Sequence, residues 1–315
     1  MADNPSFSED LTWRIEALAY DALSAVLRLL PVDWVSNFGS GLMKLIGPMT
    51  AYQSVAMTNL GFAFPEKSEA EKAAILKGVW DNVGRTFAEF VVMDRISPKT
   101  GRVEIVGLER LAAIKASGKP VIFVSGHFAN WETMMVGLFS AGIAAHVAYR
   151  PTNNPYVNRR IVEGRARYGI ELLSPKGKGG RELMLSLRRG TSIAILIDQK
   201  DTSGLDAPFL GRPAPTMAGA ARMALHYGLE VQPLSVERLG PARFRMTVHE
   251  PMTMEETGDK ARDILEGTAR INRFLEGVIR GRPQDWFFVH RRWRRREYPG
   301  GDQKRKKTAT ELEAS

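Results

Sequence analysis

The sequence predicts an α/β fold: a mixed, largely parallel β-sheet flanked by helices, with a helical segment before it. From residue 103 onward, short apolar runs alternate with amphipathic stretches of helical period. The last two runs are joined around Leu239-Gly240-Pro241, which favours a hairpin and so one antiparallel pair. We expect an N-terminal helical segment at 1–100, an α/β core at 101–298 and a charged, disordered tail at 299–315.

Composition limits the chemistry. The chain has 315 residues, no cysteine and a formal net charge of +9. Without cysteine there are no disulfides, no cysteine nucleophile and no thiolate metal ligands. Lys and Arg gather at 159–181 and again at 291–307. Such clusters favour an anionic partner: a nucleic acid, an anionic membrane surface, a phosphorylated substrate or an acidic protein.

The first predicted helix covers residues 11–30 and is apolar except for a narrow stripe of Arg14, Asp21 and Arg28. It suits either a helix in the membrane interface or a helix covered by the rest of the protein. The first ten residues are acidic, which argues against a signal peptide, and the uncharged stretch at 45–65 is broken by Gly, Pro, Gln and Asn. We therefore expect a protein that is not integral to the membrane.

Further helices are predicted at 34–46, 50–60 and 69–95. The last follows Ser68, and Glu71 three residues later completes a capping box. Asn82, Arg85 and Glu89 share one face of this helix because they lie three and four residues apart. We interpret that face as solvated.

In the core, strands are expected near 103–106, 121–125, 144–149, 192–197, 230–236 and 243–249. Helices are expected near 107–117, 131–141, 154–168, 178–189, 216–227 and 259–281. The alternation places helices on both faces of the sheet.

His127 lies in the turn after the apolar run 121–125, at the carboxyl end of a strand, where open α/β sheets bind their ligands. Glu132 follows five residues later, and on one continuous helix the two side chains would point about 140° apart. If the chain turns between them, the carboxylate can hold one ring nitrogen and leave the other to take a proton from a hydroxyl. The alternative is an ordinary turn histidine and a first-turn glutamate.

Two other strand ends carry polar side chains. Arg150 follows the run 144–149, and Asp198 with Gln199 follows the run 192–197. We expect these residues and His127 to share one edge of the sheet. No helical pair of histidines supports a metal site, and Ser125 lies outside a G-x-S-x-G elbow. The segment 284–293 interleaves aromatic residues with arginines, a pattern found in both nucleic-acid and membrane-surface proteins.

Taken together, these motifs resemble the late lipid A acyltransferase family over residues 11–296. The matching residues are Asn59-Leu60, Phe64-Pro65, Asn82, Gly84-Arg85, Glu89, Gly126 to Glu132, Tyr149-Arg150-Pro151, Asn154, Arg165, Gly169, Asp198-Gln199, Phe209-Leu210-Gly211, Pro213, Thr216, Pro283 to Trp286 and His290 to Trp293. Ala129 departs from the family, which commonly has glycine there. The family's first segment is also often a plainer membrane span than residues 11–30.

The resemblance implies transfer of a fatty acyl chain from acyl carrier protein to a hydroxyl of a 3-hydroxyacyl chain on a lipid A precursor. It implies a dyad in which His127 is the base and Glu132 orients it. Arg150, Arg165, Asp198 and Gln199 are candidates for substrate binding. The expected place is the cytoplasmic face of the Gram-negative inner membrane, peripheral or shallowly inserted on an anionic surface. We expect no metal, no other cofactor and no nucleic-acid partner.

Two alternatives stay open. One is an acyltransferase acting on another glycerolipid or on a glycolipid. The other is a non-catalytic protein that binds an anionic membrane or a nucleic acid through its carboxy-terminal arginines.

Overall fold

The computed structural model describes residues 6–149, 151–173 and 179–300. Its N-terminal part is helical, with α1 (Phe7–Leu29), α2 (Val32–Ile46), the 3-10 turn η1 (Gly47–Met49), α3 (Tyr52–Ala63) and α4 (Glu69–Glu89). The predicted capping box of Ser68 and Glu71 begins α4. The helix expected to reach residue 95 ends earlier, because the 3-10 segment η2 (Phe90–Arg95) contains a non-helical Val92.

A seven-stranded sheet forms the centre, in the order β1-β9-β8-β2-β5-β3-β4. Its strands are β1 (Val103–Val106), β2 (Ile122–Ser125), β3 (Ala145–Ala148), β4 (Glu171–Leu173), β5 (Ser192–Leu196), β8 (Val231–Gly240) and β9 (Arg243–Val248). All neighbouring pairs are parallel except β8 and β9. This confirms both the predicted hairpin and the mixed, largely parallel sheet.

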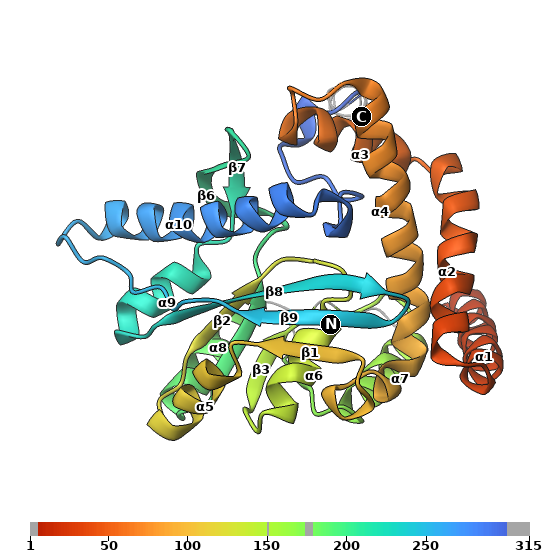
Figure 1. Ribbon diagram of the computed structural model, residues 1–315, viewed down its shortest axis with the longest axis horizontal. Coiled ribbons are helices and arrows are strands. Elements are labelled where there is room, and N and C mark those ends of the chain that lie inside the picture. The colour runs from red at the N-terminus through yellow and green to blue at the C-terminus, as the bar shows by residue number, and fades with distance from the viewer. Residues whose placement is uncertain (1–5, 150, 174–178, 301–315) are drawn as a thin grey trace.

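Helices cover both faces of the sheet, and β2 is buried on both sides. Ile122 and Val124 pack in one apolar cluster with α8 (Gly179–Arg188), α9 (Gly219–Tyr227) and α10 (Lys260–Gly281). Phe123 packs in a second cluster with α5 (Leu108–Ser117) and α6 (Glu132–Ser140). In Figure 1, α10 runs along one side of the sheet and α5 and α6 lie on the other. α7 (Pro155–Ala166) packs against α1.

The sequence did not predict β4 or the separate two-stranded hairpin of β6 (Lys200–Phe209) and β7 (Arg212–Thr216). Because β7 extends to Thr216, the helix expected from residue 216 begins at Gly219. The short 3-10 turns are η3 (Pro98–Thr100), η4 (Pro283–Asp285) and η5 (Arg295–Glu297). From residue 301, the tail predicted to be disordered lies outside the described residues.

The polar face of α4 is buried, so its interpretation as a solvated face was wrong. Glu89 is 0% exposed and Asn82 is 4% exposed. The face packs against the sheet side of the molecule and against α2, which lies alongside α4 in Figure 1. The two helices approach closely at Gly39 and Gly84, where a Cβ on either residue would lie 2.1 Å from the other's carbonyl oxygen.

The polar stripe of α1 faces the protein. Asp21 accepts hydrogen bonds from Arg160 of α7 at 2.6 and 2.5 Å, and Arg28 pairs with Asp94 of η2. The remaining face of α1 exposes large apolar side chains, including Ile15 and Leu18. Within the described ranges, no helix is both long enough and apolar enough to span a membrane.

Candidate active site

His127 lies in the turn between β2 and α6 and is held by Asp198, which follows β5. The two strands are neighbours and parallel, so their carboxyl ends meet. Nδ1 of His127 lies 2.7 Å from Oδ1 of Asp198, and the backbone N–H of His127 donates to Oδ2 at 2.8 Å. Asp198 is fully buried and also accepts a hydrogen bond from Nε1 of Trp286 at 2.8 Å.

The opposite ring nitrogen of His127 faces Gln199, whose Nε2 lies 3.3 Å from Nε2 of the ring. Trp131 packs edge-on against the imidazole, with ring centroids 4.9 Å apart, and Phe287 lies on another side. At this edge of the sheet, Nδ1 of His127 is therefore held by Asp198, whereas Nε2 faces Gln199 and the ring is packed by Trp131 and Phe287.

Asp198 carries a negative charge in this site. Burial opposes its ionisation, but the nearby His127 and its hydrogen bonds outweigh burial and hold the pKa of Asp198 well below its usual range. A buried anion that accepts from Nδ1 fixes the imidazole tautomer and stabilises the imidazolium when Nε2 takes a proton.

We expected Glu132 to contact His127, but the structure places it elsewhere. Its carboxylate is paired with the Arg165 guanidinium, through both Nε and Nη2, and accepts a hydrogen bond from the Tyr168 hydroxyl at 2.9 Å. The interpretation that Glu132 orients the imidazole was wrong, because α6 directs its side chain toward α7 while Asp198 occupies Nδ1. The catalytic roles of His127 and Glu132 stay predictions.

Glu132, Arg165 and Tyr168 form a charged centre in which the carboxylate is buried and its two partners are partly buried. Burial opposes the charge on Arg165, but the Glu132 carboxylate outweighs it and raises the arginine pKa. Burial and the same carboxylate raise the pKa of Tyr168, so its hydroxyl stays protonated and donates. The guanidinium also lies over the ring of Tyr149, 5.8 Å from its centroid.

The turn itself has an unusual backbone. Ala129 has φ of 45°, in the left-handed region that glycine adopts most easily. This explains why the resembling family commonly has glycine here. Asn130 follows, and its Oδ1 accepts a hydrogen bond from the backbone N–H of Glu132 at 3.3 Å.

The structure brings His127, Asp198 and Gln199 together as predicted, and it places Arg165 beside Glu132. Arg150 lies outside the described residues. Sequence reasoning missed Tyr168 as a partner of Glu132 and Trp286 as a partner of Asp198. Trp286 belongs to the noted aromatic–arginine segment, but nothing in that pattern indicated contact with a strand-end carboxylate.

The aromatic–arginine segment is not wholly at the surface. Arg292 is fully buried and donates to the carbonyl oxygen of Pro215 at 2.8 Å and to the Thr216 hydroxyl at 2.6 Å. Burial lowers the pKa of Arg292 to about 10. In the described ranges, no three His, Asp or Glu side chains gather as metal ligands would.

The described part of the chain has cavities away from His127. One of about 630 Å³ opens at the amino ends of the strands near Pro120 and contains no candidate site residue. Another, of about 480 Å³, lies between α1 and α7 and is lined by Tyr168, by four arginines and by three carboxylates: Arg28, Arg159, Arg160, Arg167, Asp21, Asp94 and Glu163. It adjoins the charged centre of Glu132 through Tyr168.

Comparisons with known proteins agree with this architecture. The family model described as bacterial lipid A biosynthesis acyltransferase matches residues 5–295. A Haemophilus influenzae protein named lipid A biosynthesis acyltransferase is 21% identical over 240 residues, covering 74% of this chain and 73% of the relative. An Escherichia coli protein named lipid A biosynthesis palmitoleoyltransferase is 22% identical over 298 residues, covering 85% and 94%.

A solved structure of a 1-acyl-sn-glycerophosphate acyltransferase from Thermotoga maritima covers 78% of this chain and 97% of that one, at 13% identity and a TM-score of 0.35. The family match spans nearly the whole chain and includes both strand ends that form the site. The chain therefore belongs to the bacterial lipid A biosynthesis acyltransferase family and is an acyltransferase.

Proposed function

We propose that the protein transfers a fatty acyl chain from the thioester of acyl carrier protein to the hydroxyl of a 3-hydroxyacyl chain on a lipid A precursor. The observation that carries this proposal is the His127–Asp198 pair at the sheet edge. It leaves Nε2 facing the Gln199 amide at 3.3 Å, and we propose that a substrate hydroxyl replaces this amide as the partner of Nε2.

In the reaction, Nε2 of His127 takes the proton of the acceptor hydroxyl as its oxygen attacks the thioester carbonyl. Asp198 stabilises the imidazolium that forms. The tetrahedral intermediate then expels the carrier thiolate, which takes the proton back from Nε2. Glu132 holds Arg165 at the same end of the sheet, and we propose that this arginine, with Arg150 and Gln199, binds polar groups of the substrates.

Direct transfer is favoured over a covalent acyl-enzyme. The chain has no cysteine. Ser125 is 1% exposed, and its hydroxyl lies near the carbonyl oxygen of Gly126, at 3.4 Å. The test is to mix the acyl carrier protein thioester, radiolabelled in its acyl chain, with enzyme in the absence of acceptor. The mixture is denatured rapidly, and label on the enzyme is measured. Stoichiometric protein label would contradict direct transfer.

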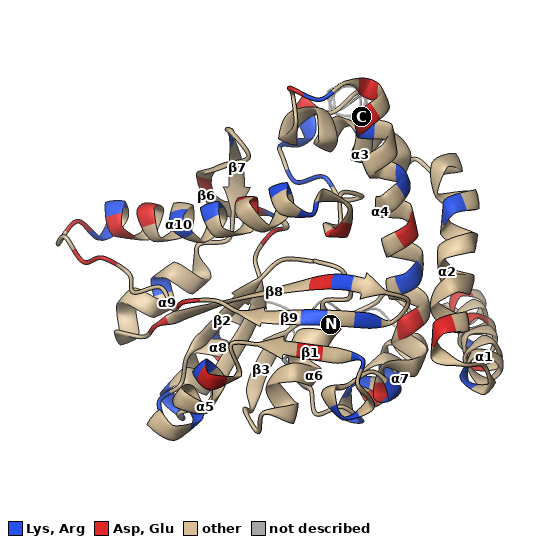
Figure 2. Ribbon diagram, viewed as in Figure 1, with Lys and Arg blue, Asp and Glu red and all other residues tan. Residues whose placement is uncertain are grey.

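We propose that the protein lies on the cytoplasmic face of the inner membrane. α2 exposes a row of apolar side chains at helical spacing: Trp34, Phe38, Leu42 and Leu45. Figure 2 shows little charge along α2, which lies next to α1 at one end of the molecule. An exposed apolar face with tryptophan suits a helix in the membrane interface.

We propose that the donor protein docks beside Gln199, where cations gather. Burial and the charges of Arg291, Arg295 and Arg294 lower the pKa of Lys200, so these side chains share one local positive field. An acidic carrier protein would bind such a field. The double substitution of Arg291 and Arg295 by glutamate should raise KM for the carrier thioester at low salt and leave kcat nearly unchanged.

The deciding experiment is mass spectrometry of lipid A from cells with the active protein, with His127→Ala and with His226→Ala, an exposed control on α9. We expect the product acylated by this protein only with the wild type and the control. Unchanged lipid A, together with acylation of another glycerolipid or glycolipid by the pure protein, would favour the first alternative. Tight, specific nucleic-acid binding with a steep salt dependence and no transfer would favour the second.

A further inference from the structure

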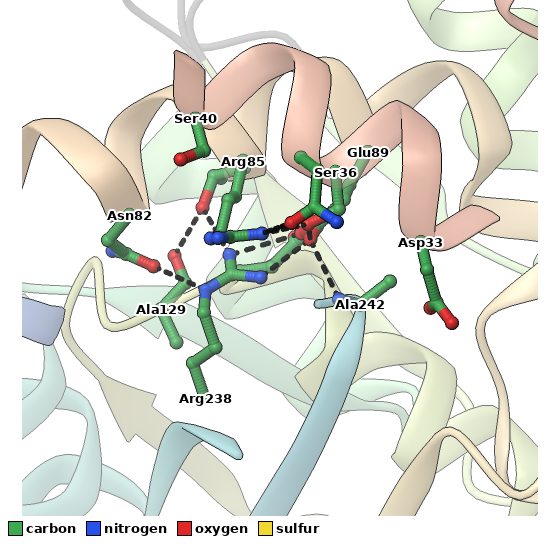
Figure 3. Close-up of polar contacts among 12 residues, drawn as sticks. Asp33, Ser36, Ser40, Asn82, Arg85, Glu89, Ala129, Arg238 and Ala242 are labelled. Atoms are coloured by element: carbon green, nitrogen blue, oxygen red, sulfur yellow. Dashed lines mark hydrogen bonds and ion pairs between the residues drawn. The ribbon is translucent and has the colours of Figure 1, made fainter. Parts of the chain in front are cut away.

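The buried polar face of α4 contacts the turn that carries His127. Three of its side chains, Asn82, Thr86 and Glu89, point toward that turn and are nearly inaccessible to solvent. Figure 3 shows the guanidinium of Arg238 directed at Asn82 and Glu89, with Ala129 of the turn close to them. They have no place in the proton transfer proposed above.

Thr86 and Glu89 contact the turn directly, and Asn82 is linked to it through the carbonyl oxygen of Asp285. The Thr86 hydroxyl donates to the carbonyl oxygen of Ala129 at 2.9 Å. The Asn130 amide donates to Oε2 of Glu89 at 3.0 Å. Asn82 donates to the carbonyl oxygen of Asp285 at 3.2 Å, and the same oxygen accepts from the backbone N–H of Ala129 at 2.7 Å. Both backbone polar groups of Ala129 are therefore held by this arrangement.

Arg238, from β8, ties the three side chains together. Its guanidinium donates to Oδ1 of Asn82 at 2.8 Å, to the Thr86 hydroxyl at 3.0 Å and to both carboxylate oxygens of Glu89 at 2.5 and 3.1 Å. A buried ion pair is weak evidence for stability, since desolvation of both charges offsets their attraction. A fully connected polar network does, however, specify one geometry.

The turn needs such support because Ala129 occupies the left-handed region without being glycine. That conformation persists only where surrounding contacts hold it. Ala129 is two residues from His127, so a change in its backbone moves the imidazole relative to the bound substrates. We infer that Thr86 and Glu89 are positioning residues, which act on the reaction by holding Ala129 and Asn130 and thereby placing His127.

The inference rests on the proposed role of His127 as base, and the test separates the two. Thr86→Val keeps the side-chain shape and removes the donor to Ala129, whereas Thr86→Ser keeps the hydroxyl. Thr268→Val is the matched control: Thr268 is also a buried helical threonine, and its hydroxyl donates to the carbonyl oxygen of Ile264 at 2.7 Å. Steady-state kcat and KM for the carrier thioester and the melting temperature are measured for each purified protein.

A displaced catalytic group lowers the rate of the chemical step rather than binding, and a displacement of about 1 Å can cost about 10²-fold. We expect Thr86→Val to lower kcat by about 10- to 100-fold with KM changed less than about threefold. Thr86→Ser should recover most of kcat. Thr268→Val should keep its activity and lose less thermal stability than Thr86→Val, because the Thr86 hydroxyl also accepts a hydrogen bond from buried Arg238.

Three results would overturn the inference: Thr86→Val with kcat near that of the wild type, a rise in KM with unchanged kcat, or an equal loss of kcat in Thr268→Val. If Thr86→Val does not fold, Thr86→Ala compared with Thr86→Ser makes the same test with smaller side chains. An active His127→Ala protein would remove the base and, with it, any need to position that residue. An inactive His127→Ala beside a fully active Thr86→Val would remove only the positioning role.

Discussion

Replacing Asp198 by asparagine tests whether this carboxylate controls His127. Asp198 accepts three hydrogen bonds: Oδ1 from Nδ1 of His127, and Oδ2 from the backbone N–H of His127 and from Nε1 of Trp286. Asparagine has one acceptor oxygen and one NH2 donor. It keeps both bonds at the Oδ2 position only if its NH2 group faces Nδ1. Nδ1 must then accept a hydrogen bond, so the ring proton moves to Nε2. Nε2 can then no longer take the proton of the acceptor hydroxyl.

The opposite amide orientation restores the useful tautomer but turns the NH2 group toward two N–H donors. Each unsatisfied buried donor costs ~1–3 kcal/mol, so this orientation lies roughly 2–6 kcal/mol higher. Its population is lower by roughly 30-fold to more than 10⁴-fold, at ~1.4 kcal/mol per factor of ten. Loss of a general base costs about 10²–10⁴-fold. We therefore expect kcat of Asp198→Asn to fall by about 10²–10⁴-fold in a folded protein.

The assay measures transfer of labelled acyl chain from carrier thioester to lipid A precursor, with near-ultraviolet circular dichroism to verify folding. Asp263→Asn is the matched control, because Asp263 is also buried and accepts two hydrogen bonds from Thr257, far from the site. A kcat within about threefold of the wild type for Asp198→Asn would falsify the assignment of the His127 tautomer to this carboxylate.

Three further predictions follow from other parts of the molecule. Glu132→Gln removes the anion that pairs with Arg165 and should lower kcat at least about tenfold. Glu163→Gln, which breaks the exposed pair with Arg159, should leave kcat unchanged. Equal kcat values for the two variants would show that the reaction does not depend on Glu132. Replacing Trp34 and Leu42 by serine should weaken sedimentation with phosphatidylglycerol vesicles about tenfold or more, and unchanged binding would place the membrane contact elsewhere. Burial lowers the pKa of His290 to about 4, against about 6.5 when unfolded, so the unfolded chain takes up a proton first as the pH falls. Stability should drop by up to about 3 kcal/mol between pH 6.5 and 4, and urea titrations of His290→Gln should show a flatter dependence.

The sequence was sufficient to place His127 and Asp198 at one edge of the sheet. Both residues follow short apolar runs, and the carboxyl ends of parallel strands meet. It was not sufficient to pair them, because Glu132 is nearer in the chain and helix geometry leaves its direction open until α7 is placed. Arg165 and Tyr168, both of which contact Glu132, lie more than thirty residues away.

The β6–β7 hairpin was missed for a different reason. Pro208 and Pro213 face each other across it, and proline normally argues against a strand. In a two-stranded ribbon both strands are edges, so a missing N–H is tolerated. The available signal in the sequence was Gly211 between the two runs. In the structure, Leu210 and Gly211 have positive φ values of 51° and 77°, as in a tight hairpin turn.

The burial of Asn82 and Glu89 also could not be read from spacing. Polar residues on one helix face are usually solvated, and the burial of these two depends on partners distant in the sequence, among them Arg238. Local pattern describes a helix face, whereas long-range partners decide whether water or protein covers it.

The close approach of Gly39 and Gly84 has a mechanical consequence. Neither position tolerates a side chain, because a Cβ on one would meet the backbone of the other. α2 and α4 therefore pack backbone against backbone at this crossing, with the apolar row of α2 on the outer side of the pair and the contacts of α4 to Ala129 on the inner side. A side chain at either glycine would push the two helices apart. It would then move both the apolar row of α2 and the contacts of α4 to Ala129. A substitution at either glycine should therefore disturb both the membrane contact that we propose for α2 and the position of His127.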